Sequence, residues 1–309
     1  MKQRLVILNP TSRNGKSERV FDKMYPDLKA RLGKIEVYHT TGPLDATARV
    51  RAALKNREAG QILVAGGDGT VNECVNGYFE DGKVLSSKVP LGVINIGTGG
   101  DFYKTIRDLS ALYDVSIKEN QYRLVDCGRV TAGDYEHYFA NIASLGVSGS
   151  AIESLKSSSF QWGSPAYFYH SLKGLALYKP VRVQISIKDT DGEWREVSED
   201  LVNFFVCNAR FSGGGMAWAP RAVLDDGAFD LVLIGGVSKL KMITDSSKVY
   251  GGRISEFPGV REYRASEVIV RSEQAFSGEI DGELFKPAHA DGVCEARYEV
   301  LPGKLPLIL

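Results

Sequence analysis

Two different patterns of hydrophobic and polar residues divide the chain. From residue 4 to about 125, short apolar runs alternate with stretches whose apolar residues recur at helical spacing. The expected strands and helices, in chain order, are 4–9, 17–32, 34–39, 44–58, 61–66, 70–80, 90–96 and 101–118. Strands that alternate with helices usually form a parallel sheet. This part of the sequence therefore predicts an α/β domain.

After Asp126 the pattern changes to short strands. The clearest is 181–188, in which the odd positions from Val181 to Ile187 are apolar and share one face. Further expected strands are 135–144, 194–197, 201–208, 228–234, 266–271, 274–280 and 294–300. Such a series is typical of a β-sandwich. We therefore expect an α/β domain with a parallel sheet over residues 1–127 and an all-β sandwich over 128–300.

The segment 150–178 lies between these strands, looks helical, and is rich in aromatic residues and lysines. Amphipathic rings and cations are both stabilised at a membrane interface, so the segment could rest there. Alternatively, its aromatic face covers the sandwich and lies in the core, which is the commoner place for such residues.

Composition narrows the function classes. The formal net charge is zero and the pI is about 6.9, so the charge gives no indication that the protein binds nucleic acid. No run of about eighteen apolar residues predicts a membrane span, and Met1–Arg4 does not begin a signal peptide. The cysteines and histidines are scattered without metal-ligand spacing, which indicates buried, reduced thiols and a cytoplasmic protein.

Three glycine-containing or polar loops follow expected strands. Gly66-Gly67-Asp68-Gly69-Thr70 leads from a strand into a helix, where backbone N–H groups favour a phosphate chain. The loops 9–16 and 96–101 have the same position after their strands, and Lys16 could reach a phosphate. Open α/β sheets bind ligands at this edge. Ordinary turn chemistry is the alternative for each loop alone.

These loops, together with Val125-Asp126-Cys127-Gly128 and Asp281-Gly282-Glu283, stand in the order seen in the diacylglycerol kinase catalytic-domain superfamily. The chain resembles that superfamily over nearly its whole length and is most similar to the bacterial soluble, YegS-like lipid kinases. The resemblance implies an ATP- and Mg²⁺-dependent kinase that phosphorylates a lipid hydroxyl in an interdomain cleft. It also implies that the tail 301–309 joins the first domain.

The resemblance assigns roles to individual residues. Asp68, Asp101 and Asp126 would form an acidic network with Mg²⁺ at the active site, and Asp68 would take part in catalysis. The general base would be Asp281 or Glu283, and the sequence does not choose between them. The nucleotide-binding positions would be Asn9, Thr40, Gly66, Gly67, Asp68, Gly69, Thr70, Val71, Asn72 and Thr98.

A second metal position is also implied. Val223, Asp226 and Ala228 match positions that hold a structural Mg²⁺ through side-chain and backbone oxygens. Plain turns are the alternative at Asp226-Gly227 and at Asp281-Gly282, because Asp-Gly is a strong hairpin signal.

Two residues depart from the family pattern. Gly100 stands where relatives usually have Asn, and Asn95 stands where a Pro is common. The segment 94–100 is similar to one in NAD kinase, which makes NAD kinase an alternative. A nucleotide-sensing module without catalysis is another. Lipid kinase ranks first because Asp101-Phe102 and the segments 125–128 and 225–231 fit it.

The expected partners are a lipid with a free hydroxyl, a membrane surface in transient peripheral contact, and a second copy in a possible homodimer.

Overall fold

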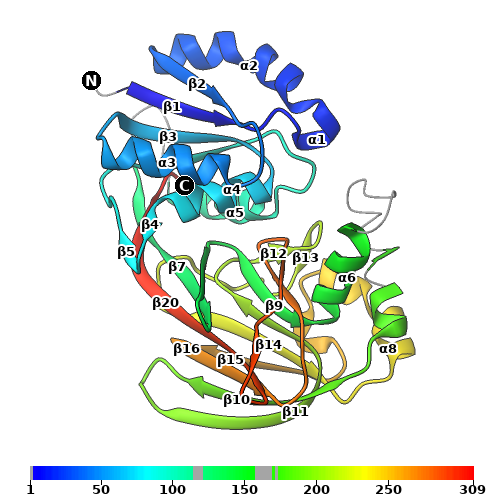
Figure 1. Ribbon diagram of the computed structural model, residues 1–309. Coiled ribbons are helices and arrows are strands. Elements are labelled where there is room, and N and C mark those ends of the chain that lie inside the picture. The colour runs from blue at the N-terminus through cyan, green and yellow to red at the C-terminus, as the bar shows by residue number, and fades with distance from the viewer. Residues whose placement is uncertain (1–2, 114–120, 157–168, 171–172) are drawn as a thin grey trace. The chain divides into compact units, whose positions relative to one another are not determined.

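The computed structural model describes residues 3–113, 121–156, 169–170 and 173–309. The chain divides into two compact units, one of Met1–Val125 with Gly303–Leu309 and one of Asp126–Pro302. Figure 1 shows the elements of both units, and each unit is described by itself below.

The first unit contains a parallel sheet in the order β6–β3–β1–β2. Its strands are β1 (Gln3–Leu8), β2 (Ile35–His39), β3 (Ala59–Gly66) and β6 (Leu91–Asn95). The end of β20 (Val293–Leu307) adds a further parallel pair, Leu307 beside Leu91. The central strands read as continuous apolar runs because helices cover both faces of a parallel sheet.

Helices connect these strands. They are α1 (Ser12–Gly15), α2 (Ser17–Leu32), α3 (Asp45–Lys55), α4 (Asp68–Gly77) and α5 (Asp101–Tyr113). Phe21 and Leu32 of α2 pack against Val6 and Leu8 of β1, while Figure 1 shows α3 and α4 on the opposite face of the sheet. A hairpin of β4 (Phe79–Glu80) and β5 (Lys83–Val84) follows α4. The parallel α/β architecture is the predicted one.

The second unit is a sandwich of antiparallel strands. One layer pairs β18, β17, β9, the last part of β11, β14 and β15, and the other pairs the first part of β11 with β10, β16, β20, β7 and β8. The strands are β7 (Arg123–Ala132), β8 (Tyr135–Phe139), β9 (Ile142–Gly146), β10 (Val181–Lys188), β11 (Trp194–Cys207), β14 (Phe229–Gly235), β15 (Val260–Ala265), β16 (Glu267–Ser272), β17 (Gly278–Ile280) and β18 (Glu283–Phe285).

Shorter elements complete the second unit. They are α6 (Val147–Lys156), α8 (Lys239–Thr244), α9 (Ser247–Tyr250), the 3₁₀ turn Ile254–Glu256, and the two-residue strands β12 (Phe211–Ser212), β13 (Met216–Ala217) and β19 (His289–Ala290). Residues 173–177 are also helical.

The long strand β11 joins two hydrophobic clusters. Phe204 and Val206 lie in the cluster between the two layers, and Phe205 and Cys207 lie in a second cluster on the outer face. Residues 173–177, α8 and α9 cover that outer face through Leu175, Met242 and Val249. Because both faces of residues 201–207 are buried, this part of β11 is apolar except at Asn203 instead of alternating.

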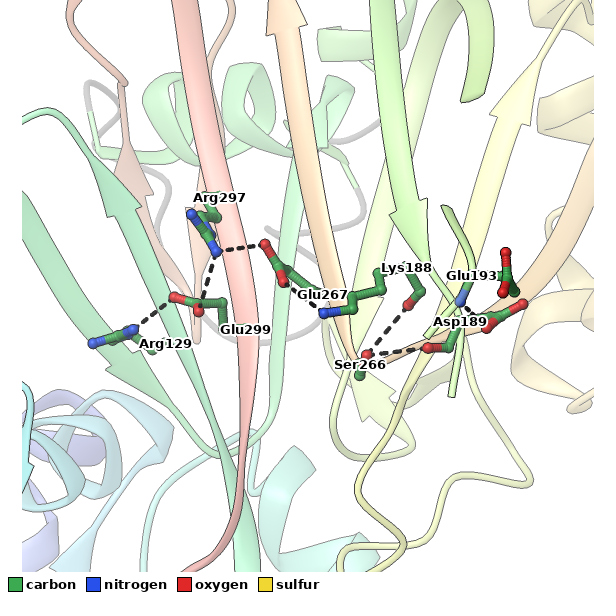
Figure 2. Close-up of polar contacts among 8 residues, drawn as sticks. All are labelled: Arg129, Lys188, Asp189, Glu193, Ser266, Glu267, Arg297 and Glu299. Carbon is green, nitrogen blue, oxygen red and sulfur yellow. Dashed lines mark hydrogen bonds and ion pairs between the residues drawn. The ribbon is translucent and has the colours of Figure 1, made fainter. Parts of the chain in front are cut away.

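A chain of charges crosses the outer face of the other layer (Figure 2). Arg129 of β7 pairs with Glu299 of β20, and Arg297 pairs with both Glu299 and Glu267. Glu267 also lies 3.9 Å from the Lys188 ammonium of β10. The pairs therefore link four adjacent strands, β7, β20, β16 and β10.

Several element boundaries differ from the prediction. The expected strand 274–280 is wrong for 274–277, because β17 begins only at Gly278. The expected strand 135–144 is two strands, and the expected pair 194–197 and 201–208 is one. In the expected helical segment 150–178, residues 150–156, 169–170 and 173–177 are helical, and residues 157–168 and 171–172 lie outside the described residues.

The four cysteines are buried and form no disulfide, as predicted. Burial raises the pKa of the Cys74, Cys127 and Cys207 thiols well above the usual value. Among the helices of the described residues, none has both the length and the apolar character needed to cross a membrane.

Candidate active site

The Asp68 carboxylate joins two of the predicted loops of the first unit. Asp68 begins α4, and its two carboxylate oxygens accept the backbone N–H groups of Asp101 (3.1 Å) and Phe102 (3.2 Å). These N–H groups belong to the first turn of α5, where intrahelical acceptors are missing. Asp68 therefore caps a helix that begins 33 residues further along the chain.

The partly exposed Asp68 and the buried Asp101 form an acidic pair. Burial, and then the negative charge of Asp101, raise the pKa of Asp68. Asp101 is itself buried and pairs with Lys104 at 2.7 Å. Two carboxylates removed from water are stabilised by a cation. This pair therefore fits a divalent metal of the kind predicted from the sequence, and Lys104 supplies one positive charge already.

Asn9 ties the first loop to the second. Its side-chain Nδ2 donates to the Thr70 hydroxyl at 3.0 Å, and its side-chain Oδ1 accepts the N–H of Thr11. The backbone N–H of Thr40, at the end of β2, donates to the carbonyl of Leu8. Asn9, Thr40 and Asp68 thus stand at the carboxyl ends of adjacent parallel strands, which is where open α/β sheets bind ligands.

Three glycines of the predicted loops differ in the space around them. A Cβ on Gly97 would lie 2.6 Å from the Cα of Gly67, and a Cβ on Gly66 would lie 2.6 Å from the Thr70 hydroxyl oxygen. Gly66 and Gly97 therefore allow the loops to pack against one another. A Cβ on Gly67 would meet nothing closer than 3.9 Å, so Gly67 leaves space beside the start of α4.

The other predicted nucleotide positions differ in exposure. Val71 and Asn72 are buried within α4, whereas Gly69 is partly exposed and Thr98 is exposed. Asn95 and Gly100, the two residues that depart from the family pattern, lie against one another. Gly100 has a φ of +60°, and a Cβ there would lie 2.3 Å from the Asn95 amide nitrogen.

In the second unit, Asp126 is buried and holds the loop before β14. Its carboxylate accepts the N–H of Gly227 at 2.7 Å, and its own N–H donates to the carbonyl of Leu224. Asn208 donates to the carbonyl of Asp126. Asp126 therefore positions the segment that carries Val223, Asp226 and Ala228.

The Asp226 carboxylate has partners within the protein. One oxygen accepts the N–H of Ala228 at 3.2 Å and the other forms an ion pair with Arg264. Asp226, Val223 and Arg264 line a cavity of about 450 Å³. Within the described residues, no three acidic, histidine or cysteine side chains gather in a metal-binding cluster. A structural Mg²⁺ at Asp226 would have to displace Arg264, and it stays a prediction.

Asp281 and Glu283 belong to a hairpin between β17 and β18. Asp281 and Gly282 are its two loop residues, with φ values of +49° and +88°, as in a type I′ turn. The Asp281 carboxylate is buried and accepts the N–H groups of Ala140, Asn141 and Ile142. Glu283 is exposed at the first position of β18.

Sequence reasoning missed a buried acid beside this turn. Glu279 accepts the N–H of Gly282 at 2.6 Å and the hydroxyl of Ser144 at 3.0 Å. Ser144 in turn lies 2.7 Å from the Ser148 hydroxyl. Its position in the middle of an apolar strand could have indicated this role, because a buried carboxylate requires hydrogen-bond partners inside the protein.

An apolar cavity of about 100 Å³ lies on the outer face of the sandwich layer. Its walls include Leu175, Phe205, Trp218 and Met242, and the Phe205 and Trp218 rings stack with centroids 3.8 Å apart. Ser148 and Asn203 supply polar groups on one side. The sequence did not predict this cavity.

Comparison with known proteins places these features in a family. Residues 3–130 match the family described as "Diacylglycerol kinase catalytic domain", and residues 141–309 match the "YegS C-terminal NAD kinase beta sandwich-like domain". The fold and the two matched domains are thus those of a lipid kinase. The chain belongs to the diacylglycerol kinase family of lipid kinases, in the group with a YegS-type C-terminal domain.

Curated relatives are similar to this chain in sequence along most of their length. The chain is 28% identical to "Diacylglycerol kinase" of Bacillus subtilis, over 92% of this chain and 90% of the relative. It is 29% identical to "Probable lipid kinase YegS-like" of Xanthomonas euvesicatoria, over 80% of each. A crystal structure of a diacylglycerol kinase from Bacillus anthracis has the same fold, with a TM-score of 0.66 at 20% identity, over 99% of this chain and 96% of that one.

Proposed function

We propose that this chain transfers the γ-phosphoryl group of ATP to the free hydroxyl of a diacylglycerol-class lipid, with Mg²⁺ as the metal. The observation that carries the proposal is the junction at Asp68, where one carboxylate links the glycine loop of β3 to the N-terminus of α5. This junction fits a triphosphate bound by a metal, and the curated relatives carry the name of the reaction.

The first unit supplies the nucleotide-binding groups in this proposal. The first N–H groups of α4 and the side chain of Asn9 would orient the phosphates, because the start of a helix favours negative charge. Asp68 and Asp101 would hold Mg²⁺, which neutralises charge on the transferring group. Asp126 belongs to the second unit, and its part in the metal site stays a prediction. Lys104 balances part of the charge of Asp101 in the protein itself.

Glu283 is the proposed general base. The hydroxyl of the lipid loses its proton to a carboxylate as its oxygen bonds to the γ-phosphorus and the bond to ADP breaks. Asp281 already accepts three backbone N–H groups, so its oxygens are engaged, whereas Glu283 is exposed. Asp281 and Glu279 are assigned as positioning residues, because both fix the turn that carries Glu283.

The second unit would bind the lipid. The apolar cavity beside Phe205 and Trp218 suits part of an acyl chain, and Ser148 and Asn203 are polar groups at its wall. Since such lipids reside in bilayers, the proposal includes transient contact with a membrane surface.

The test is a transfer assay. The purified chain, Mg²⁺ and γ-labelled ATP are incubated with diacylglycerol in mixed micelles and, in a parallel tube, with NAD. We expect label in an organic-extractable phospholipid. Label in NADP would assign the chain to NAD kinases, and bound ATP without any labelled product would favour a sensing module.

A further inference from the structure

A chain of hydrogen bonds leads from the apolar cavity to the turn that carries Glu283. Ser148 lines the cavity, and its hydroxyl lies 2.7 Å from the hydroxyl of Ser144 on β9. The Ser144 hydroxyl donates to one oxygen of the Glu279 carboxylate at 3.0 Å, and the other oxygen accepts the N–H of Gly282 at 2.6 Å. Gly282 immediately precedes Glu283. Three hydrogen bonds therefore connect the wall of the cavity to this turn.

The side chains of this hydrogen-bond chain are removed from water. Ser144 is fully buried, while Glu279 is 3% and Ser148 is 5% exposed. A buried carboxylate depends on its protein donors, because water is not there to replace a donor that is lost. A shift of one member is therefore passed to the next and is not compensated by solvent.

The first turn of α6 contacts both the cavity and β17. Val147 and Ser148 line the cavity, and Asn203, another residue of its wall, accepts the N–H of Ser148 at 3.0 Å through its side-chain oxygen. The next residue, Gly149, lies so close to β17 that a Cβ there would be 2.5 Å from the backbone nitrogen of Gly278. Because no space separates this turn from β17, a displacement of the turn reaches the strand directly.

We propose that this hydrogen-bond chain transmits occupancy of the apolar cavity to Glu283, with Ser144, Ser148 and Glu279 as positioning residues. An acyl chain in the cavity restricts Ser148 and the first turn of α6. The hydrogen bonds then hold Gly282 in the orientation that suits proton transfer from the lipid hydroxyl to the Glu283 carboxylate. The apolar part of the lipid thereby raises kcat and not only affinity.

This inference rests on the proposed function, which assigns the cavity to an acyl chain and the role of base to Glu283. The hydrogen-bond chain itself lies within the second unit and exists without nucleotide. Its response to a ligand in the cavity can therefore be measured without catalysis.

The first experiment measures this response by hydrogen–deuterium exchange of the full chain. Decanoic acid is the probe, and its binding is followed by tryptophan fluorescence because Trp218 lines the cavity. We expect saturating decanoic acid to slow exchange over residues 278–285 by about threefold or more. Unchanged exchange over this segment would overturn the proposal. Decanoic acid that does not bind would also overturn it, because the cavity would then take no acyl chain.

Two variants break the hydrogen-bond chain at different points. Ser144→Ala removes the donor to Glu279, and Ser148→Ala removes the hydroxyl at the cavity wall. Both should bind decanoic acid like the unmodified chain, without slower exchange over residues 278–285. Ser148→Thr keeps a hydroxyl and should restore the slower exchange. If exchange still slows in both alanine variants, the hydroxyl groups do not carry the coupling.

Ser186→Ala is the matched control. Ser186 is a serine of similar burial, 7% exposed, on β10 in the other layer of the sandwich. This variant should bind decanoic acid and retain the slower exchange over residues 278–285. Thermal unfolding of each variant checks that it is folded. If Ser144→Ala raises exchange equally in both layers, its effect is one of stability, and the positioning role is wrong.

Turnover gives a second readout that a merely structural role would not change in the same way. We expect kcat of the unmodified chain to be about tenfold higher for a diacylglycerol with long acyl chains than for one with short chains. In Ser144→Ala, kcat for the long-chain lipid should fall to the short-chain value, with KM for Mg-ATP unchanged. An equal loss of kcat for both lipids would contradict the coupling.

The coupling and the proposed function can fail separately. Slower exchange with bound decanoic acid, without any phosphorylated lipid, would support the link between cavity and turn and overturn the proposed function. Phosphorylated lipid with the same kcat for both chain lengths and no change in exchange would support the proposed function and overturn the coupling.

Discussion

Asp281 and Glu283 stand two residues apart, yet the structure holds their side chains in opposite ways. The Asp281 carboxylate accepts three backbone N–H groups and lies in the interior, while Glu283 is exposed. A carboxylate that is fixed by three donors orients its turn and has little freedom to accept a further proton. The motif therefore divides into a positioning acid and an accessible acid, which the sequence alone left undivided.

This division predicts different outcomes for two substitutions. Asp281→Asn replaces one acceptor oxygen by an NH₂ donor that faces backbone donors, so it should reduce the unfolding free energy by about 1–3 kcal/mol. Glu283→Gln should leave the unfolding temperature unchanged and lower kcat about a hundredfold or more, with nucleotide binding retained. Thermal unfolding and the labelled-ATP assay measure both effects.

The control is a second Asp-Gly turn of the same unit. Asp291 and Gly292 join β19 to β20 with φ values of +52° and +82°, and Asp291 is exposed. Asp291→Asn should change neither stability nor activity. An active Glu283→Gln variant would remove Glu283 from the role of base.

Gly97 gives a second prediction at the residue scale. A methyl group on Gly97 would lie 2.6 Å from the Cα of Gly67, and neither backbone can move without shifting its loop. Gly97→Ala should therefore weaken ATP binding about tenfold or more and destabilise the first unit by about 1–3 kcal/mol. Isothermal titration with Mg-ATP and thermal unfolding measure this.

Gly42→Ala is the matched control, because a Cβ on Gly42 would meet no atom within 4 Å. It should bind Mg-ATP normally. If Gly97→Ala also binds normally, close packing of the two loops is not needed for the site.

The sequence could predict the acids of the site but not their contacts. Asp68, Asp101, Asp126 and Asp281 stood in motifs. That Asp68 caps α5 depends on how β3 and β6 pair, and local pattern does not contain this pairing. Glu279 was missed because its role depends on Ser144, which lies 135 residues away in the chain.

At the scale of elements, apolar periodicity was most reliable where one face alone is buried. The strand 181–188 has the same ends in sequence and structure, because its apolar residues alternate. The polar residues Ser198, Glu199 and Asp200 suggested a break, yet β11 runs through them. Two of these side chains form ion pairs across the sheet. Asp200 pairs with Arg182, and Glu199 pairs with Arg261.

The edge strand β15 was not predicted for a related reason. Its sequence Val260-Arg261-Glu262-Tyr263-Arg264-Ala265 is largely charged, and its strand conformation depends on pairing with β14. Charged residues suit a sheet edge, since they oppose further pairing. Such a strand shows weak periodicity although its backbone is fully extended.

The charge network of Figure 2 gives a prediction at this scale. Arg297 lies between Glu267 and Glu299, whose side chains are 12% and 23% exposed. Arg297→Met keeps an apolar stem but leaves two partly buried carboxylates on adjacent strands without the cation between them. It should reduce the unfolding free energy by about 1–2 kcal/mol, measured by urea denaturation.

Arg182→Met is the comparison, because Arg182 and Asp200 form an exposed pair with 61% and 65% of their side chains accessible. Exposed pairs contribute little, so the loss should stay below about 0.5 kcal/mol. Equal losses in the two variants would show that the network adds nothing beyond ordinary surface pairs.

At the scale of the whole molecule, the two units should respond differently to acid. In the first unit, the N–H of Thr41 and then the hydroxyl of Tyr38 lower the pKa of Asp45, so this interaction weakens only in strong acid. In the second unit, burial lowers the pKa of His137 from 6.5 to about 4, against the opposing influence of Glu283. The histidine therefore makes the second unit sensitive to milder acid.

The direction of the stability change with pH follows from proton uptake by His137. Above pH 6.5, His137 is neutral in both the folded and the unfolded chain and costs nothing. Between pH 6.5 and about 4, the unfolded chain takes up a proton that the folded chain does not, so stability falls with decreasing pH. The slope from this one group is at most about 1.4 kcal/mol per pH unit.

His137→Phe removes this titration and keeps a ring that can stack on Tyr135, as the imidazole does at a centroid distance of 6.0 Å. We expect the unfolding temperature of the unmodified chain to fall between pH 7 and pH 5, and that of the variant to fall less. Carboxylates titrate mainly below this range, so the difference between the two proteins isolates the histidine. Parallel curves from pH 7 to pH 5 would mean that His137 takes up a proton as readily in the folded chain as in the unfolded chain.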